Sequence, residues 1–596
     1  MKKIIYSFLL ALTVGFISSC DDLLDAPSKS AMDEAVIFST PSLAEGAVAG
    51  IIQSFCEQNS YRGRYLVYYG INTDCEVTNS PKSTTTDKAR LANYNTNVSN
   101  GEMNTDNNAW AKFYEGIERA NLAIRGLRTY GDVENNAQLA QLLGEVLTLR
   151  AVVYNDLLKA WGNVPARFAP VNSETVYLPK TDRDIIYKQL LADLEEAAEL
   201  VAWPNEIAAT KSTERVNKAF VKGLRARLAL AAGGYSQRVD GIVRPSTDPD
   251  LVPEKMYAIA KKECLDVINS GTCSLLPSFE EVFKTLCGEK CVAGLESLWE
   301  IPFSEGRGRV IFDLGVKHTD KDKYTGQAKG GTNGPNPVMY YEYDASDTRR
   351  DVTCVPYEWA GGKQVPTNLN KWYFGKYRYE WLPRVVTSDN DDGLNWLYMR
   401  YADVILMAAE AINELDGPAA AAPYLQMIRS RAFSKNPEKV TEFMTGATAS
   451  KEAFFKAIVD ERALEFTGEM LRKGDLIRWN LLGAKLQEVK TKLEQLENRT
   501  DKYVNLPTKI YYKTNADGET VDIYGLNFGD TDAEGGSLGY ESSDTWKLND
   551  SKEPTPYWET LYLRDPDTQQ FWPIWQVFLD SSNGMLNNDG YNTPSN

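Results

Sequence analysis

Hydrophobic residues recur every three or four positions over much of the chain, which is the period of an amphipathic α-helix. The clearest such segment spans 106–131, and Asp106 is its candidate N-cap. Its periodic positions are Trp110, Phe113, Tyr114, Ile117, Ala120, Asn121 and Ile124. A second helix is predicted at 136–161. It ends before Gly162 and Pro165, because proline cannot continue the backbone hydrogen-bond ladder.

The same period predicts further helices in two blocks of the chain. These are 182–201, 218–232, 254–269, 396–415, 418–432, 451–467 and 470–497. They fall into antiparallel-looking pairs of about 34–45 residues, a length typical of helical-repeat proteins. The pattern therefore favours an all-α, tetratricopeptide-like scaffold, although the strict repeat consensus is absent.

Two long stretches, 300–395 and 500–596, lack this period and are rich in Gly, Asn, Asp, Pro and aromatic residues. Loops this long in a folded protein usually bind a ligand or are disordered, and their many aromatic rings disfavour disorder. We therefore expect a single domain at 20–596. Its helical scaffold would span about 35–300 and 395–498, and the two loop regions would interrupt and follow it.

The N-terminus has the pattern of a bacterial export signal. Lys2 and Lys3 precede an apolar run at 4–17, which is too short to span a bilayer. The run leads into Ile-Ser-Ser-Cys, which looks like a lipobox. We therefore predict a lipoprotein signal peptide at 1–19 and lipidation of Cys20, which would anchor the protein to a membrane. The alternative is a plain secretory signal with a chance cysteine.

The charge balance of the chain is strongly acidic. Without the two lysines of the signal it is 63 basic minus 82 acidic residues, or −19. An acidic surface argues against nucleic acid as a partner and against binding through anionic lipid headgroups.

The chain has one histidine, His318, which restricts the catalytic chemistry open to it. Ser-His-Asp and Cys-His nucleophile pairs could use only this residue. Its neighbours Lys317, Asp320 and Lys321 predict a solvated loop, so we expect His318 to be non-catalytic. With one histidine and no CxxC motif, a zinc site is not expected.

Seven cysteines remain once Cys20 is lipidated, and an odd count leaves at least one thiol unpaired unless it bonds another chain. The plausible local pairs are Cys264 with Cys273 and Cys287 with Cys291. Connectivity cannot be deduced from the sequence alone.

A stripe of alternating charges occupies the last predicted helices. Its members are Glu461, Arg462, Glu465, Arg472, Asp475 and Arg478, and Arg400, Asp403 and Glu410 are expected to join it from a neighbouring helix. Carboxylates grouped in this way could be mistaken for the carboxyl pair of a glycosidase. The arginines among them, however, would lower the carboxyl pKa values, whereas a general acid needs a raised pKa. We therefore predict a structural ion-pair network and no catalytic residue.

Several blocks of the sequence, in order, resemble the SusD/RagB family of outer-membrane lipoproteins. Early blocks are WAKFYEGIERAN at 110–121 and the segment 149–165, which ends in WGNVP. The strongest blocks are LYMRYADVILMAAEA at 397–411 and the segment 458–479. The end of the chain departs from the family pattern, with Trp575 for a proline and Asn588-Asp589 where Asn-Pro is usual. These departures affect loop geometry.

The resemblance implies a function as well as a fold. Members capture oligosaccharides, in some cases peptides, and deliver them to a SusC-like TonB-dependent transporter without catalysis. It also implies attachment to the outer membrane through a lipid anchor, facing the cell surface. Asp21 and Asp22, directly after the lipidated cysteine, resemble a surface-export signal.

Sugar recognition needs flat apolar faces for the ring and planar donors and acceptors for the hydroxyls. The resemblance favours polar ligand contacts before the Trp110 block and stacking aromatics in the loops after Trp299. The candidate ligand-binding residues are Asp74, Arg90, Asn93, Tyr94, Tyr324, Trp359 and Trp372. Tyr65 and Tyr69 are expected to pack as helix core, and Tyr340–Tyr343 to belong to the scaffold.

Two alternatives stay open beside glycan capture. A peptide-binding import lipoprotein of the RagB type would use the same fold and similar aromatic loops. A surface glycoside hydrolase is disfavoured by the arginines among the carboxylates. No cofactor is expected, although Asp389–Asp392 could hold a structural calcium without offering the full ligand spacing.

Overall fold

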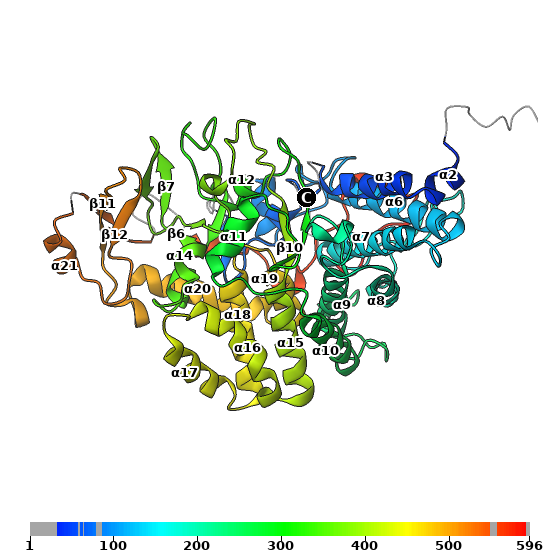
Figure 1. Cartoon of the computed structure of the whole chain (residues 1–596). Coiled ribbons are helices and arrows are strands. Elements are labelled where there is room, and N and C mark those ends of the chain that lie inside the picture. Colours follow the sequence, from blue (N-terminus) through cyan, green and yellow to red (C-terminus); the bar gives the residue numbers. More distant parts are fainter. Residues whose placement is uncertain are drawn as a thin grey trace, which may run out of the picture.

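The computed structural model describes residues 32–57, 60–63, 65–78, 86–540, 542–548 and 557–591 (Figure 1). The predicted signal peptide, Cys20, Asp21 and Asp22 lie outside the described residues. No helix within the described part of the chain is both long and apolar enough to span a membrane.

A series of helices, most of them long, forms the scaffold (Figure 1). They are α2 (Glu34–Ser39), α3 (Pro41–Phe55), α6 (Ala109–Tyr130), α7 (Ala137–Trp161), α8 (Arg183–Leu200), α9 (Lys218–Gly233), α10 (Pro253–Ser270), α15 (Tyr401–Asp416), α16 (Pro418–Ala432), α17 (Pro437–Ala447) and α18 (Lys451–Phe466). From α6 to α10 each helix packs against the next. α10 then packs against α15, across the 300–395 insertion, and α15 against α16. This serial packing is the arrangement that helix pairs adopt in a helical-repeat scaffold.

Local sequence explains where these helices begin. The Asn108 side chain accepts a hydrogen bond from Ala111 N at 3.2 Å, so Asn108 caps α6 and the prediction of Asp106 was wrong by two residues. Asn136 caps α7 in the same way, and Asn217 caps α9. Such caps contribute about 1 kcal/mol each. α7 is buried on nearly all sides, because α3, α6, α8 and α9 all contact it.

A two-stranded sheet joins the two ends of the 300–395 insertion. β4 (Ser297–Ile301) pairs antiparallel with β10 (Trp396–Arg400), with Trp396 opposite Ile301 and Arg400 opposite Ser297. The prediction of a helix from residue 396 was therefore wrong for its first five residues. The strand passes directly into α15 at Tyr401.

The insertion contains short elements and little regular structure. They are α12 (Val310–Leu314), β5 (Asn333–Pro335), α13 (Met339–Glu342), α14 (Arg350–Thr353), β6 (Cys354–Val355), β7 (Tyr357–Ala360), β8 (Lys363–Pro366) and β9 (Tyr373–Phe374). β5 pairs with β1 (Glu76–Thr78), β6 with β9, and β7 with β8 as a hairpin. In Figure 1, α12 and β7 of the hairpin lie in the upper part of the molecule. Below them lies α11 (Phe279–Cys287), which precedes the insertion.

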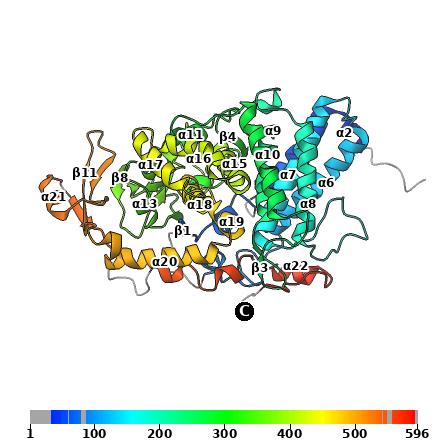
Figure 2. The same cartoon turned by 90° about the horizontal axis from the view of Figure 1, so that it is seen from below.

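The C-terminal part packs along one side of the scaffold (Figure 2). The prediction of one helix at 470–497 was wrong, because the chain breaks into α19 (Arg472–Arg478) and α20 (Leu482–Asn498), with Asn480 at a positive φ of 59° between them. β11 (Lys509–Thr514) then lies between β12 (Val521–Tyr524) and β13 (Ser542–Thr545). The remaining α-helices and strands are α4 (Leu66–Tyr69), α5 (Asp87–Ala92), β2 (Ser236–Gln237), β3 (Val243–Arg244), α21 (Asp532–Ser537) and α22 (Gln576–Ser581).

The seven cysteines of the described residues are all free thiols, so both suggested local disulfides were wrong. The partners within each pair face different surroundings. The Cys287 sulfur lies 4.0 Å from the Lys376 carbonyl oxygen, whereas the Cys291 sulfur lies 3.7 Å from Glu214 Oε1. Cys264 is buried in α10, and Cys273 Sγ contacts Thr272 Oγ1 at 3.8 Å.

Candidate functional site

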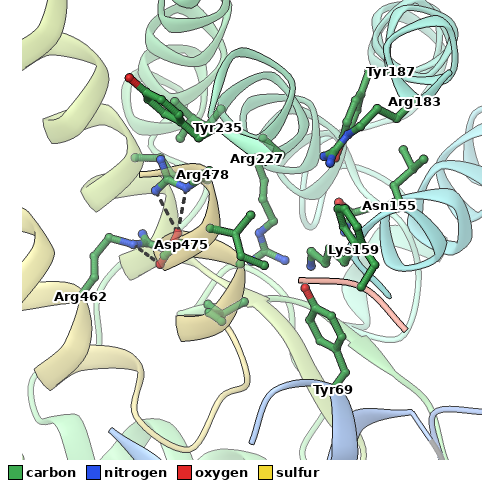
Figure 3. Close-up of a pocket in the computed structure, with 18 residues that line it drawn as sticks. Tyr69, Asn155, Lys159, Arg183, Tyr187, Arg227, Tyr235, Arg462, Asp475 and Arg478 are labelled. Carbon is green, nitrogen blue, oxygen red and sulfur yellow. Dashed lines mark hydrogen bonds and ion pairs between the residues drawn. The ribbon is translucent and has the colours of Figure 1, made fainter. Parts of the chain in front are cut away.

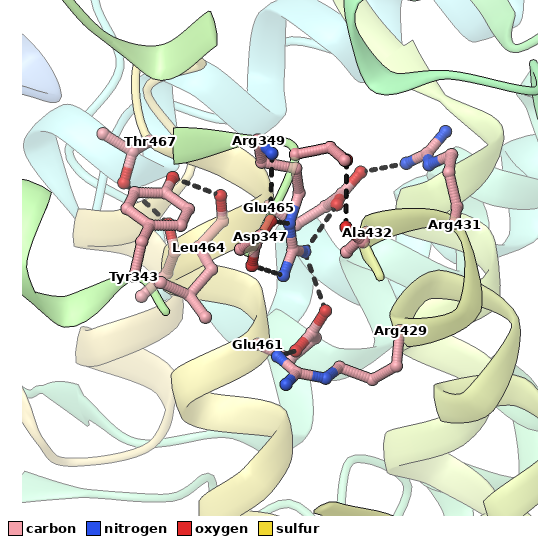
Figure 4. Close-up of polar contacts among 12 residues, drawn as sticks. Tyr343, Asp347, Arg349, Arg429, Arg431, Ala432, Glu461, Leu464, Glu465 and Thr467 are labelled. Carbon is pink, nitrogen blue, oxygen red and sulfur yellow. Dashed lines mark hydrogen bonds and ion pairs between the residues drawn. The ribbon is translucent and has the colours of Figure 1, made fainter. Parts of the chain in front are cut away.

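A buried ion-pair network connects α16 and α18 with Arg349 of the insertion (Figure 4). Glu465 of α18 accepts hydrogen bonds from Arg400 Nη1 at 2.6 Å and Arg349 Nη1 at 2.9 Å, and a third from Arg431. Burial alone would raise the pKa of Glu465, but Arg431, Arg400 and Arg349 together hold it well below its usual range. A carboxyl held ionised in this way cannot donate a proton as a general acid.

All nine side chains of the predicted network make ion pairs. Arg462 lies 2.7 Å from Asp403 and 2.7 Å from Asp475, and Arg478 pairs with Glu410. Sequence reasoning missed further members, namely Arg227, Glu296, Asp347, Arg349, Arg429, Arg431 and Glu469. The closely spaced Asp347 and Arg349, which pair at 2.7 Å, were the one local signal for them.

Asp74 joins the same network. Its carboxylate makes two bonds to the guanidinium of Arg472, at 2.8 Å to Nε and 2.6 Å to Nη2. Only 11% of the Asp74 side chain is exposed. In this structure the residue predicted to contact ligand holds the start of β1 against α19.

Tyr324 and Trp359 lie together in the insertion, as two of the predicted stacking residues. Their rings meet edge to face with centroids 5.3 Å apart, and Trp359 stacks on His318 at 5.8 Å. Trp359 is 3% exposed, whereas the Tyr324 ring is half-buried and reaches the surface. Tyr324 is thus the more exposed ring of this pair.

His318 is fully buried, so the prediction of a solvated loop was wrong. The backbones of His318 and Lys329 exchange two hydrogen bonds of 2.8 Å, which fold the segment back on itself. The ring then lies between Asp322, bonded to Nδ1, and Glu380, 3.9 Å from Nε2. Burial raises the pKa of both carboxyls, but interaction with His318 contributes to a net shift below their usual range.

A polar rim adjoins the aromatic pair through the segment 386–391. Val386 N donates to the Tyr324 carbonyl at 3.0 Å, and Gln327 Nε2 donates to Asp389 Oδ1 at 3.0 Å. Asp391, at the end of this segment, forms a two-point ion pair with Arg62, with Nε and Oδ1 2.7 Å apart. The pair connects the two regions of the sequence that were predicted to contribute ligand contacts.

The second loop region, 500–596, also contacts the segment around Tyr324. Lys323 Nζ lies 2.7 Å from Glu519, between β11 and β12, and it lies 5.1 Å from the centroid of the Tyr324 ring. The backbone of Gln364 in β8 donates to the Glu519 carbonyl at 2.7 Å. We call this set the loop surface and define it as Arg62, Lys323, Tyr324, Trp359, Asp389, Asp391 and Glu519.

Asp392 follows Asp391 of the loop surface and is fully buried. Its Oδ2 accepts from the backbone nitrogens of Ile311 at 2.9 Å and Phe312 at 3.1 Å, which fixes the start of α12. Burial raises the pKa of Asp392 to about 7, although these amide hydrogen bonds oppose the shift. The neighbouring Asp313 is buried too, and burial raises its pKa to about 7.

The carboxylates that were considered for calcium have protein partners. Asp391 pairs with Arg62, Asp392 accepts backbone amides, and Asp389 accepts from Gln327. Across the described ranges, no group of three or more His, Cys, Asp or Glu side chains is arranged to hold a metal ion.

The other predicted ligand residues lie away from the loop surface. The Tyr94 hydroxyl donates to the Asn72 carbonyl at 2.9 Å, and Trp372 stacks on Tyr340 at 4.8 Å. Tyr94 and Trp372 belong to a hydrophobic cluster separate from that of Trp359, and Asn93 is 2% exposed. Arg90, about one-third exposed, lies 4.0 Å from Asp87. A direct ligand contact by Asn93, Tyr94 or Trp372 would require the surrounding chain to open.

The sequence of this chain is similar to family models and to known proteins. The family model described as the SusD family matches residues 314–591, and one described as starch-binding associating with outer membrane matches residues 24–230. Two SusD-like proteins of Formosa agariphila are similar along most of their length. One is 24% identical over 505 residues, covering 78% of this chain and 88% of that protein. The other is 25% identical over 509 residues, covering 81% and 91%.

Solved structures share the fold. A SusD homolog from Bacteroides thetaiotaomicron superposes with a TM-score of 0.67 at 20% identity, covering 78% of this chain and 91% of the homolog. Surface glycan-binding protein A of the same organism, solved in complex with laminarihexaose, gives 0.59 at 19% identity, covering 92% and 99%. The helical scaffold with its small sheets is thus the SusD fold. The two family-model matches and the curated relatives together identify the chain as a SusD-like protein.

Proposed function

We propose that this protein captures oligosaccharides at the outer surface of the outer membrane and passes them to a TonB-dependent transporter without cleaving them. The observation that carries the proposal is the loop surface, where a half-buried tyrosine ring lies beside the ion pairs Arg62–Asp391 and Lys323–Glu519. An aromatic face with fixed polar groups around it suits a sugar ring and its hydroxyls.

The ion pairs support a binding role over a hydrolytic one. A glycosidase needs two carboxyl groups facing one bond, one of them protonated. At the loop surface Asp391 is neutralised by Arg62, and Glu519 by Lys323. Asp313 and Asp392, whose raised pKa values would suit an acid, are 7% exposed and 0% exposed and lie beneath the surface.

The membrane attachment and the partner are parts of the same proposal. Lipidation of Cys20 would tether the protein to the membrane, and Asp21 and Asp22 would direct it outward. The match to a family described as associating with the outer membrane supports this location. A transporter partner would take over the captured oligosaccharide.

The test is a direct titration of purified residues 21–596 with oligosaccharides. Laminarihexaose is the first probe, because a protein of the same fold was solved with it. Xylan, mannan and starch oligosaccharides and a set of peptides complete the panel. Binding to one sugar class, with unchanged sugar chain length after prolonged incubation, would support the proposal.

Tyr324→Ala tests whether the loop surface is the binding site. Its matched control is Tyr177→Ala, since Tyr177 is a 44% exposed tyrosine in the loop between α7 and α8. Loss of binding only in the first variant would place the ligand at the loop surface. Binding of peptides alone would replace the sugar by a peptide ligand, and shortened sugar chains would contradict the absence of catalysis.

A further inference from the structure

A small cavity lies between helices α7, α8 and α9 on one side and α19 on the other (Figure 3). Its volume is about 60 Å³. No residue of the loop surface lines it, so it is a separate feature of the molecule. The cavity is lined by cationic side chains from both halves of the scaffold, namely Lys159, Arg183, Arg227, Arg462 and Arg478.

Four of these five cations have carboxylate partners. Arg478 and Arg462 share Asp475, at 2.9 Å and 2.7 Å, as the dashed lines of Figure 3 show. The remaining partners are Asp403 for Arg227, at 2.6 Å, and Asp156 for Lys159, at 3.2 Å.

Arg183 is the exception. It is 6% exposed, and within the part of the chain that the structure describes no carboxylate lies within ion-pair distance of it. Its guanidinium donates to the Tyr187 hydroxyl at 3.1 Å and to Ser236, and it packs over the ring of Phe571 at 5.7 Å. A buried guanidinium with only neutral partners lacks the charge compensation that buried ions usually have.

A buried hydroxyl without a hydrogen-bond partner in the described part of the chain lines the same cavity. The Tyr69 hydroxyl is buried and has no hydrogen-bond partner among the described residues. In Figure 3 this hydroxyl points from below toward the space near Lys159 and Arg227. Burial lowers the pKa of Lys159, its pair with Asp156 opposes this, and the nearby Arg227 lowers it further. An unpaired hydroxyl among crowded cations is suited to an acceptor that carries negative charge.

We infer that this cavity binds one small oxyanion group, a carboxylate or a sulfate, between Arg183, Lys159 and the Tyr69 hydroxyl. The volume of the cavity suits such a group. One water molecule needs about 15 Å³ of cavity volume, so 60 Å³ accommodates about four or five non-hydrogen atoms. Leu158, Leu230 and Ile477 supply apolar walls. A free anion and an acidic sugar would present the same chemistry to the cavity.

The experiment titrates residues 21–596 with sodium selenate, sodium acetate, glucuronate and neutral glucose at constant ionic strength set with chloride. Crystals grown with selenate would locate the ion by the anomalous signal of selenium. We expect saturable binding of the anions, no binding of glucose at this site, and selenium within hydrogen-bond distance of Arg183. Tighter binding of glucuronate than of acetate would identify an acidic sugar as the source, and the reverse would identify a free anion.

Variants connect the binding to the cavity. Arg183→Gln should weaken anion binding about tenfold to a hundredfold, since charge-assisted hydrogen bonds are lost. Tyr69→Phe, which keeps the ring, should weaken it about threefold to tenfold. The control is Arg128→Gln, because Arg128 is a 47% exposed surface residue paired with Glu196.

Two results would overturn the inference. One is anion binding in Tyr69→Phe and Arg183→Gln equal to that of the unaltered protein. The other is a selenium signal confined to sites outside the cavity. Loss of oligosaccharide binding at the loop surface would not bear on this site, so the two proposals fail independently.

Discussion

The guanidinium of Arg62 and the carboxylate of Asp391 form a two-point ion pair that holds the loop after α3 against the 386–391 segment. The side chains are 14% and 15% exposed, so solvent screens the pair only in part. Asp391 belongs to the 386–391 segment, which also hydrogen-bonds Tyr324. The Arg62–Asp391 pair therefore helps to fix the position of this polar segment relative to the Tyr324 ring. The geometry of the loop surface therefore depends on a contact between segments far apart in sequence.

This contact gives the first prediction. Arg62→Ala and Asp391→Ala should each weaken binding of a captured oligosaccharide about tenfold, because the rim loses its fixed position. The double variant should be little worse than either single one, with a coupling free energy of about 1 kcal/mol. Isothermal titration of the four proteins measures this cycle. Fully additive losses would mean that the two side chains act separately.

Tyr324 gives the second prediction. Tyr324→Ala should weaken oligosaccharide binding by about 1–3 kcal/mol if the ring stacks on a sugar, as for other aromatic anchors. Tyr324→Phe should bind nearly as well, since stacking uses the ring and not the hydroxyl. Trp359→Ala should also lower stability, because Trp359 is 3% exposed. Unchanged affinity in Tyr324→Ala would remove this residue from the site.

The buried network gives the third prediction. Glu465→Gln leaves Arg349, Arg400 and Arg431 around a neutral amide, and breaking a buried ion pair in this way costs about 3–5 kcal/mol. The midpoint of urea unfolding measures the change. Glu488→Gln is the control, because Glu488 is 43% exposed and exposed pairs contribute about 1 kcal/mol or less. Equal midpoints for the two variants would contradict a structural role for the network.

Much of the scaffold could be predicted from the sequence because its helices bury periodic stripes. The period identified α6 to α10 to within a few residues, since each helix packs an apolar face on its neighbours. It could not identify the strand Trp396–Arg400, whose pairing partner Ser297–Ile301 lies on the far side of the insertion. Residues adjacent in the sequence contain no information about that pairing. The apolar residues at 396–399 are as compatible with the start of α15 as with a strand.

The candidate site was harder to predict, because exposure in loops depends on contacts distant in sequence. The charged neighbours of His318 favoured a solvated loop, yet Trp359 and Glu380 enclose its ring. Likewise, the number of aromatic residues in the insertion does not show which rings face outward. Trp372 lies in the core against Tyr340, whereas Tyr324 reaches the surface.

The free thiols give the fourth prediction. In residues 21–596, reducing agent should leave the melting temperature unchanged, because the seven cysteines there form no disulfide. Only Cys56 and Cys291 are partly exposed, and burial raises the pKa of each thiol to about 12. Thiol titration of the folded protein should therefore be slow, and unfolding in urea should release all seven groups. A lower melting temperature on reduction would show that a disulfide exists.

Asp392 gives the last prediction, which concerns pH. Burial raises its pKa from 3.8 to about 7 in the folded protein, whereas in the unfolded chain it ionises near 3.8. The contribution of Asp392 to stability is therefore fully present below about pH 4 and is lost as pH rises to about 7. The loss amounts to on the order of 4 kcal/mol. Asp392→Asn keeps an oxygen that can accept from Ile311 and Phe312 and removes the titration.

The free energy of unfolding, measured by urea between about pH 4 and 8, checks this sign. Relative to the unaltered protein, Asp392→Asn should become progressively more stable as pH rises through this range, because only the unaltered protein must keep a buried carboxyl protonated or bury its charge. Asp250→Asn serves as the control, since Asp250 is 68% exposed. Parallel stability curves for Asp392→Asn and the unaltered protein would mean that Asp392 ionises near its ordinary pKa in the folded state. The amide contacts at the start of α12 would then outweigh the effect of burial.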